Sequence, residues 1–350
     1  MSTGLTEPRD RGRWRVRISA AVVLGVLVGV VVLAACIGPV RIPASEVVSS
    51  ISAHLFGTKS STSPIDDAVI WDLRLPRIVL AALVGAMLSV SGAAYQGVLR
   101  NTLADPYLLG VAAGGGLGAT VAIVLGVNGT LWLPLAAFVG SLGAVVMTYV
   151  IATSGSERGD RSVIILAGVA VAAMLTAIQT FLQQQHTDEI RQIYNWLLGS
   201  FSVATWGDVG LAAPYIVVSI VILMAHRRIL DVLRVGADEA GTLGLHPTRT
   251  RLLIVGAATL GTAAAVSVSG LIGFVGIIVP HAFRLATSAS YRVLMPLAMI
   301  GGAAFMVLAD LIGRTIEAPT EVPIGVVTAL VGAPAFLVIL RSRRGRGGAL

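Results

Sequence analysis

Residues 106–156 read PYLLGVAAGGGLGATVAIVLGVNGTLWLPLAAFVGSLGAVVMTYVIATSGS and contain no Asp, Glu, Lys or Arg. A backbone inside lipid must satisfy every N–H and C=O group within its own segment, so an apolar stretch of about 20 residues predicts a membrane-spanning helix. This stretch is too long for one such helix, and Asn128-Gly129 followed by Pro134 predicts a turn within it. We therefore expect two spanning helices here, in a protein that resides in a membrane.

The same pattern extends along the chain in both directions. Charged residues are also absent from the stretches 18–40, 252–283 and 322–340. Ten spans are expected in all: 18–37, 75–100, two within 106–156, 162–182, 209–225, 252–268, 271–285, 293–312 and 322–340. A polar stretch is expected at 38–72 and an interfacial segment at 183–207. The predicted fold class is an all-α polytopic membrane protein with about ten transmembrane helices.

The composition agrees with this fold class. Hydrophobic residues make up 55% of the chain, charged residues 12%, and the mean hydropathy is +0.87. The single cysteine, Cys36, excludes an internal disulfide. It ends the sequence LAAC at 33–36, which resembles a lipoprotein cleavage box. Cleavage there would leave nine spans and place the two ends of the remaining chain on opposite sides, so an uncleaved first span is the preferred interpretation.

Basic residues predict which side of the membrane each loop occupies. With ten spans both termini share one side, and 19 of the 25 basic residues fall on that side. The other six are Arg41, Lys59, Arg74, Arg77, Arg191 and Arg314. By the positive-inside rule both termini are cytoplasmic, so the net charge of +7 reflects topology rather than a nucleic-acid partner. The expected organisation is a cytoplasmic tail at 1–17, a transmembrane domain at 18–340 and a cytoplasmic tail at 341–350.

No motif for catalysis or metal binding is found in the sequence. Lys59 is the only lysine, and it does not follow a Gly-rich phosphate loop. The five histidines are scattered, and no Cys/His cluster has metal-ligand spacing. We therefore expect no catalytic residue, no metal ligand and no cofactor bound by this chain, and we do not expect an enzyme.

The energy for transport is then expected to come from another subunit. Ion-coupled secondary transporters usually keep ionisable residues inside the bilayer, whereas almost every charge here lies at the end of a span. Asp310 is the main candidate for an intramembrane acid, and Arg314 lies one helical turn away as its partner. A pore-forming subunit driven by a separate motor is the preferred interpretation. A stand-alone secondary transporter is the alternative.

The cytoplasmic segment 227–251 supports a separate motor. We expect two short helices divided near Gly236, the second ending at Gly244. Ala240 and Leu243 give this second helix a small apolar face. A short helix of this kind suits docking into a groove of a partner protein.

A set of short motifs then occurs in order between residues 71 and 340. They are LRLPR at 73–77, SGAAYQG at 91–97, NTLADP at 101–106, SGLIGFVG at 269–276, PHAFR at 280–284, AD at 309–310, VPIGVVT at 322–328 and GAP at 332–334. As an ordered set they resemble the permease subunits of binding-protein-dependent ATP-binding-cassette (ABC) importers for iron–siderophore complexes, haem and vitamin B12, the FecCD family.

This resemblance implies a type II ABC importer permease in the cytoplasmic membrane. Such permeases have ten helices and work as dimers, here with the same or a related chain. Two ATPase subunits bind ATP and Mg, and an extracytoplasmic substrate-binding protein delivers the solute. An iron–siderophore complex is the first expected substrate, with cobalamin and haem left open. A metal-ion permease of another ABC group is a further alternative, which the lack of a His-rich or carboxylate-rich path disfavours.

The resemblance also implies three groups of site residues. Docking of the binding protein is expected at Arg74, Arg77 and Arg314. Coupling to the ATPase, in the loop at 227–251, is expected at Asp231, Leu233, Gly236, Asp238, Glu239, Ala240, Leu243, Gly244 and Leu245. The translocation path and gate are expected at Gly85, Ser89, Ser91, Gly92, Gln96, Asn101, Asp105 and Pro106.

Small residues in the second span also have a physical interpretation of their own. Four of them recur at intervals of four: Gly85, Ser89, Ala93 and Gly97. Such a stripe lets helices pack closely, which is its commoner role, or leaves space for a bulky solute. Gly114 and Gly118 form a second pair for which only packing is expected. The segment 101–106 is expected to turn the chain at the inner gate, with Asp105 as the cap of the next helix.

Overall fold

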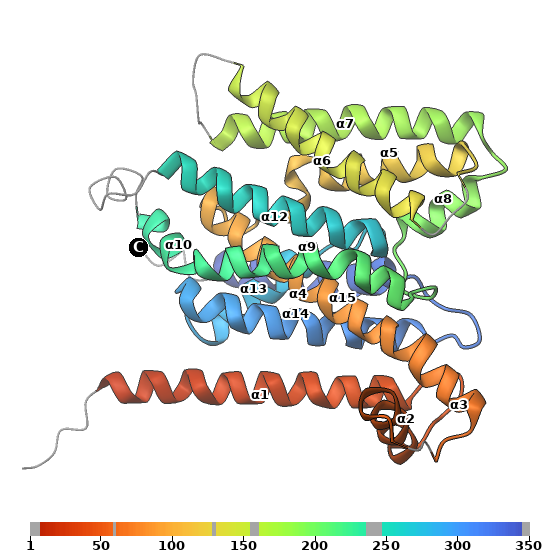
Figure 1. Cartoon of the computed structure of the whole chain (residues 1–350). Coiled ribbons are helices and arrows are strands. Elements are labelled where there is room, and N and C mark those ends of the chain that lie inside the picture. The colour runs from red at the N-terminus through yellow and green to blue at the C-terminus, as the bar shows by residue number, and fades with distance from the viewer. Residues whose placement is uncertain (1–7, 59–60, 128–130, 155–160, 236–246, 345–350) are drawn as a thin grey trace, which may run out of the picture.

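The structure, a computed structural model, describes residues 8–58, 61–127, 131–154, 161–235 and 247–344 (Figure 1). Every regular element within these ranges is a helix. The elements are α1 (Pro8–Cys36), α2 (Ala44–Phe56), α3 (Pro64–Ala68), the π-helical turn η1 (Val69–Arg74), α4 (Leu75–Leu99), the 3₁₀ turn η2 (Pro106–Leu109), α5 (Val111–Val124), α6 (Trp132–Thr153), α7 (Arg161–Gln185), α8 (Ile190–Leu197), α9 (Trp206–Ala225), α10 (Arg227–Val235), α12 (Pro247–Ser269), α13 (Val275–Ala286), α14 (Tyr291–Gly313) and α15 (Ile324–Arg344).

Ten of these helices correspond to the ten expected spans. Seven are long and apolar enough to cross a membrane, namely α1, the continuous α3–η1–α4 segment, α6, α7, α9, α12 and α14. The other three, α5, α13 and the apolar part of α15, are shorter apolar helices. The all-α polytopic fold is confirmed, and the stretch 106–156 contains the two expected helices, α5 and α6. The turn predicted at Asn128-Gly129 lies outside the described residues.

The short helices α5 and α13 begin inside the bundle rather than at its end. Gly276, in the first turn of α13, lies against Pro106 and against the carbonyl of Leu88, which is halfway along α4. The 12 residues of α13 extend about 18 Å, less than the roughly 30 Å of bilayer hydrocarbon. Irregular backbone at this depth is tolerated because it is enclosed by protein.

Helix α4 forms the centre of the bundle because small residues let its neighbours approach. A Cβ built on Gly85 would overlap the Gly302 carbonyl of α14, and one built on Gly92 would overlap the Gly276 carbonyl of α13. The same close approach joins α5 and α6, where Gly114 lies against Gly140. Packing between small residues, expected for both stripes, is confirmed at these positions.

Two segments outside the ten expected spans contain helices. The stretch expected to be polar, 38–72, contains the helices α2 and α3, for which the sequence analysis made no prediction. Ser63 caps α3 by accepting the Asp66 N–H, and Val47 and Ile42 are buried against the bundle. The expected interfacial segment contains α8, whose single buried side chain is Ile193.

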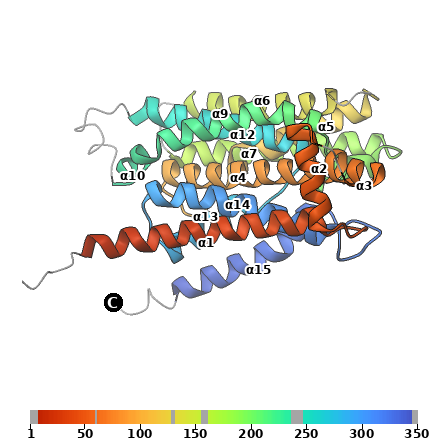
Figure 2. The ribbon, with the colours of Figure 1, turned by 60° about the horizontal axis from the view of Figure 1, so that its bottom comes forward.

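Helix directions place several chain ends at one side of the bundle. In both views α1 begins, α15 ends, and α10 and the start of α12 lie at the same side (Figures 1 and 2). We call this side the predicted cytoplasmic end, after the charge-based prediction, and the opposite side the predicted external end.

Candidate functional site

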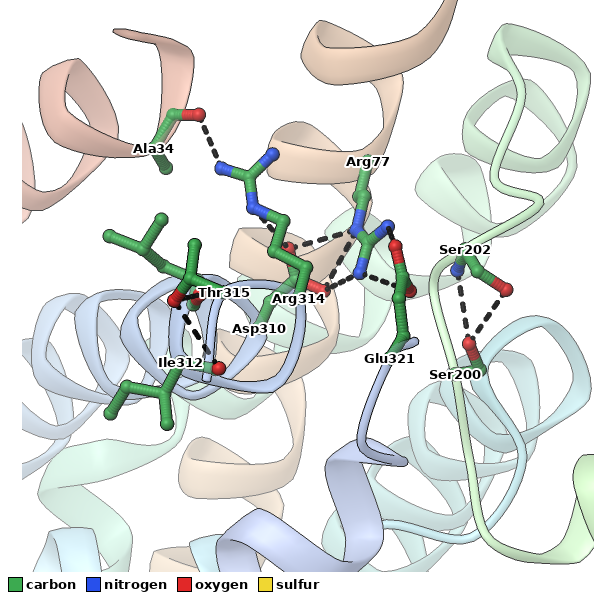
Figure 3. Close-up of polar contacts among 10 residues, drawn as sticks. Ala34, Arg77, Ser200, Ser202, Asp310, Ile312, Arg314, Thr315 and Glu321 are labelled. Carbon is green, nitrogen blue, oxygen red and sulfur yellow. Dashed lines mark hydrogen bonds and ion pairs between the residues drawn. The ribbon is translucent and has the colours of Figure 1, made fainter. Parts of the chain in front are cut away.

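Three arginines and two carboxylates meet at the predicted external end, and we call them the external charge cluster. Its members are Arg74, Arg77, Asp310, Arg314 and Glu321. Arg77 Nε donates to Asp310 Oδ1 and Oδ2 at 2.9 and 3.0 Å. Its Nη1 and Nη2 donate to Glu321 Oε1 and Oε2 at 2.8 and 2.9 Å (Figure 3). Planar, charge-assisted pairs of this kind are among the strongest hydrogen bonds in proteins.

Local sequence explains where the cluster forms. Pro76 lacks an N–H group and is favoured in the first turn of a helix, so α4 begins here, directly after the π-helical turn at 69–74. Arg77 therefore lies in the first turn of α4, and Asp310 lies in the last turn of α14. The two helices run in opposite directions, which brings these turns together.

The remaining two arginines tie α1 to the cluster. Arg314 Nε lies 3.9 Å from Asp310 Oδ2, and its Nη2 donates to the Ala34 carbonyl (Figure 3). Arg74 donates to the Ala35 carbonyl at 2.7 Å and to the Val40 carbonyl. The cluster thus bonds the last turn of α1 to the ends of α4 and α14.

Burial makes the pairing in this cluster necessary. Asp310 is 0% exposed and Arg77 is 8% exposed. Removing one partner of a buried ion pair typically costs about 3–5 kcal/mol, because the other charge is left uncompensated in a region of low dielectric. Three guanidinium groups against two carboxylates leave the cluster with a net positive charge.

The three arginines expected to dock the binding protein are buried in this conformation. Arg74, Arg77 and Arg314 are 5%, 8% and 3% exposed, and each bonds to groups of its own chain. Contact of these arginines with a binding protein therefore stays a prediction. The charge pattern located the residues along the chain, but the direction of their side chains depends on Asp310 and on the end of α1.

Sequence reasoning found one of the contacts in this cluster and missed two acid–base pairs. The expected partnership of Asp310 with Arg314 is confirmed, because the two residues lie four apart on one helix. The pairs of Arg77 with Asp310 and Glu321 join residues 233 and 244 positions apart. The only signal was that Glu321 precedes Val322-Pro323 at the expected external end.

The path residues of α4 are buried between helices. Gly85 and Ser89 pack against Gly302 of α14. Ser91 Oγ donates to the Ala258 carbonyl of α12 at 3.2 Å. Gln96 Nε2 donates to the Gly276 carbonyl of α13 at 3.1 Å and Gln96 Oε1 accepts from Arg284 at 2.9 Å. Gly92 also faces α13, so this part of α4 is a packing surface here, and a path-lining role remains a prediction.

The other path residues lie in the turn between α4 and α5. Asn101 Oδ1 accepts the Leu103 N–H, and Asp105 Oδ1 accepts the Tyr107 N–H at 2.7 Å as the cap of η2. The predicted capping role of Asp105 is confirmed. Pro106 packs on Gly276. The Tyr107 hydroxyl donates to the Ile272 carbonyl at 3.0 Å and accepts the Ile272 N–H at 3.1 Å, which satisfies the backbone of the turn before α13.

Two of the coupling residues lie in α10 and face the bundle. Asp231 accepts from Ser290 Oγ and from the Tyr291 N–H, both at 2.7 Å, at the start of α14. Leu233 is 1% exposed, and its carbonyl accepts from Arg100 Nε at 2.9 Å. The second short helix and seven coupling residues lie outside the described residues: Gly236, Asp238, Glu239, Ala240, Leu243, Gly244 and Leu245.

The polar side chains described above are arranged to fix the positions of helix ends. Among the described residues no group of three His, Cys, Asp or Glu side chains could hold a metal ion. The buried acid Asp310 is paired with arginines, and Asp231 bonds to the start of α14. These contacts hold the two ends of α14 in place. Breaking the contacts at either end would therefore alter how α14 packs against its neighbours.

Comparisons with known proteins agree with this architecture. The sequence profile of the FecCD transport family matches residues 26–342. The chain is 44% identical over 278 residues to the cobalamin import system permease BtuC of Halobacterium salinarum, covering 79% of this chain and 74% of that protein. It is 39% identical over 289 residues to the hemin transport permease HmuU of Yersinia pestis, covering 80% and 85%.

A solved structure is also similar along nearly the whole chain. It is a metal-chelate type ABC transporter in an inward-facing conformation, with a TM-score of 0.81, 28% sequence identity, and coverage of 92% of this chain and 98% of that chain. The bundle, its short helices and the matched family profile lead to one conclusion. The chain belongs to the FecCD transport family and is a multi-pass permease of the ABC importer type.

Proposed function

We propose that this chain carries a metal chelate across the cytoplasmic membrane, using ATP hydrolysed by partner subunits. The observation that carries the proposal is the family match over residues 26–342, with relatives whose names specify cobalamin and hemin import. Cobalamin is the first substrate to test, because the relative with 44% identity is a cobalamin permease. Haem follows, and iron–siderophore complexes, the first expectation from sequence, remain within the proposal.

The proposed assembly contains two permease chains, two ATPase subunits and an extracytoplasmic binding protein. Coupling through α10 is supported by its contacts. Asp231 joins α10 to the start of α14, and buried Leu233 joins it to the end of α4 through Arg100. A force applied to the adjoining segment 236–246 would therefore reach both helices. Asp231 and Leu233 then transmit movement, while the residues from Gly236 to Leu245 make the contact with the ATPase.

The external charge cluster is proposed to guide the binding protein rather than to bond with it directly. Its net positive charge lies just below the predicted external surface, close enough to attract acidic groups within about 10 Å at 0.1 M salt. Arg74 is expected to contribute a full positive charge to this attraction, because it bonds to carbonyl groups and pairs with no described carboxylate within ion-pair distance. Electrostatic guidance of this kind acts mainly on the association rate.

Uptake by cells lacking the gene tests the proposed function. Labelled cobalamin, haem and ferric siderophores would be supplied to the deletion strain, with and without the restored chain. We expect uptake of one chelate to be lost and then recovered by the wild-type chain. A variant lacking residues 237–245 should insert in the membrane but fail to restore uptake. If that variant restored chelate uptake, and ionophores abolished this uptake, the result would instead support a secondary transporter. If the restored chain brought back uptake of free zinc or manganese, the result would support a metal-ion permease.

The guiding role is tested by association kinetics with the cognate binding protein. Arg74→Gln should lower the association rate several-fold at low salt and leave the dissociation rate nearly unchanged. The matched control is Arg249→Gln, which removes an exposed arginine at the other end of the bundle. An equal change in both variants, or a change confined to the dissociation rate, would contradict the proposal.

A further inference from the structure

An apolar cavity lies between α4, α6, α7 and α12 toward the predicted cytoplasmic end. Its volume is about 670 Å³, within the range of roughly 300–1,000 Å³ typical of sites for small organic ligands. Its wall is mainly aliphatic, as shown by Val98, Leu142, Val145, Val146, Leu252 and Val255. None of the site residues discussed above lines it.

The cavity opens sideways, toward the surface that faces lipid. Val146 and Leu252 line it and are also 62% and 49% exposed. Both belong to helices that are long and apolar enough to cross the membrane. With these helices spanning a bilayer, the mouth of the cavity would face hydrocarbon, and an acyl chain could enter it without passing through water.

A guanidinium group without an acceptor lies at the shallow end of the cavity. Arg251 lines the cavity in the second turn of α12, and its Nε and Nη2 are buried with no hydrogen-bond partner in the described part of the chain. Arg100 lies near enough for the two positive charges to repel. No carboxylate of the described residues forms an ion pair with either arginine. An anion is the group that this position lacks.

The deep end of the cavity, by contrast, has no unmet polar group. Tyr95 and Thr259 both line it, and their hydroxyl oxygens are hydrogen-bonded to each other at 2.7 Å. From Arg251 to Thr259 the helix rises about 12 Å, compared with about 15 Å for one half of the bilayer hydrocarbon. The cavity thus has a charged shallow end, an apolar wall and a depth close to that of one leaflet.

We propose that this cavity is a binding site for an anionic glycerophospholipid of the adjoining leaflet. One acyl chain lies along Val146 and Leu252, and the phosphate accepts hydrogen bonds from the Arg251 guanidinium. Guanidinium groups match phosphate oxygens in geometry as well as charge. Basic pockets between transmembrane helices at the cytoplasmic side are known to hold acidic lipid head groups. The proposal does not depend on which chelate is transported.

Native mass spectrometry of the detergent-purified full chain, titrated with phosphatidylglycerol, tests the site. Arg251→Gln should weaken phosphatidylglycerol binding about fivefold, the effect expected for one basic residue near a membrane surface. Val146→Trp should weaken it about fifteenfold by shutting about two methylenes out of the cavity. The matched controls are Arg249→Gln, two positions away and exposed, and Val218→Trp, an exposed position of α9 outside the cavity. Both controls should bind as the wild type does.

Further titrations separate the possible occupants. Phosphatidylcholine should bind more weakly than phosphatidylglycerol to the wild type. To Arg251→Gln the two lipids should bind equally well. Inorganic phosphate in excess should not displace phosphatidylglycerol. Displacement by phosphate, with unchanged binding to Val146→Trp, would mean a free-anion site and would overturn the proposal. So would equal affinity for the two lipids, or phosphatidylglycerol binding that neither cavity variant changes.

Discussion

Breaking the Arg77–Asp310 pair should destabilise the chain by an amount that the geometry predicts. In Asp310→Asn, Arg77 keeps both bonds to Glu321 and Arg314 keeps its bond to the Ala34 carbonyl, so the cost should lie at the lower end of the range for buried pairs, about 3 kcal/mol. In Arg77→Gln, Asp310 keeps only Arg314 at 3.9 Å while fully buried, so the cost should approach about 5 kcal/mol.

The double variant separates pairing from the loss of two independent side chains. Arg77→Gln with Asp310→Asn leaves no uncompensated charge between these two positions, so the double variant should cost about 5 kcal/mol rather than the sum of about 8 kcal/mol. The free energy of unfolding would be measured by reversible denaturation from mixed micelles. Glu317→Gln, an exposed acid in the following loop, serves as control and should change stability by less than about 0.5 kcal/mol. Additive single effects, or equal losses in Glu317→Gln and Asp310→Asn, would refute the reasoning.

Three further variants probe other contacts by the same unfolding measurement. Gly85→Ala should destabilise the chain by about 1–3 kcal/mol because its Cβ would push α4 and α14 apart. The control Gly143→Ala, with open space around it, should be nearly neutral or stabilising. Equal effects of the two substitutions would contradict close packing of α4 against α14. Tyr107→Phe leaves the backbone before α13 unsatisfied and should cost about 1–3 kcal/mol, against little change in exposed Tyr194→Phe. Asp231→Ala removes both bonds to the start of α14 and should cost about 1–2 kcal/mol while lowering transport more than ATP hydrolysis. Parallel losses of transport and hydrolysis would argue against a coupling role.

The parts of the fold that lipid dictates could be predicted from sequence. Membrane thickness and the need for internal hydrogen bonds fix the length and apolarity of a span, so the ten spans follow from the gaps between charges. Local pairs could also be predicted, because Asp310 and Arg314 are neighbours on any helix. The helix α2 was missed, although buried Val47 and partly buried Ile51 recur at helical spacing.

Long-range geometry could not be predicted in the same way. The side chain of Arg77 is directed by carboxylates more than 230 residues away, so its burial depends on how α4 and α14 meet. The partner of Gly85 is likewise set by helix crossing rather than by the stripe itself. The cavity beside Arg251 also arises only from the assembled helices, since its wall comes from α4, α6, α7 and α12.

The most direct test of the central claim is the energy source for transport. The chain would be reconstituted with its cognate ATPase in liposomes, and uptake of labelled cobalamin from its binding protein would be measured with and without ATP on the ATPase side. We predict uptake that requires ATP and is unaffected by ionophores that abolish proton and sodium gradients. Uptake without ATP that ionophores abolish would contradict the assignment as an ATP-driven permease.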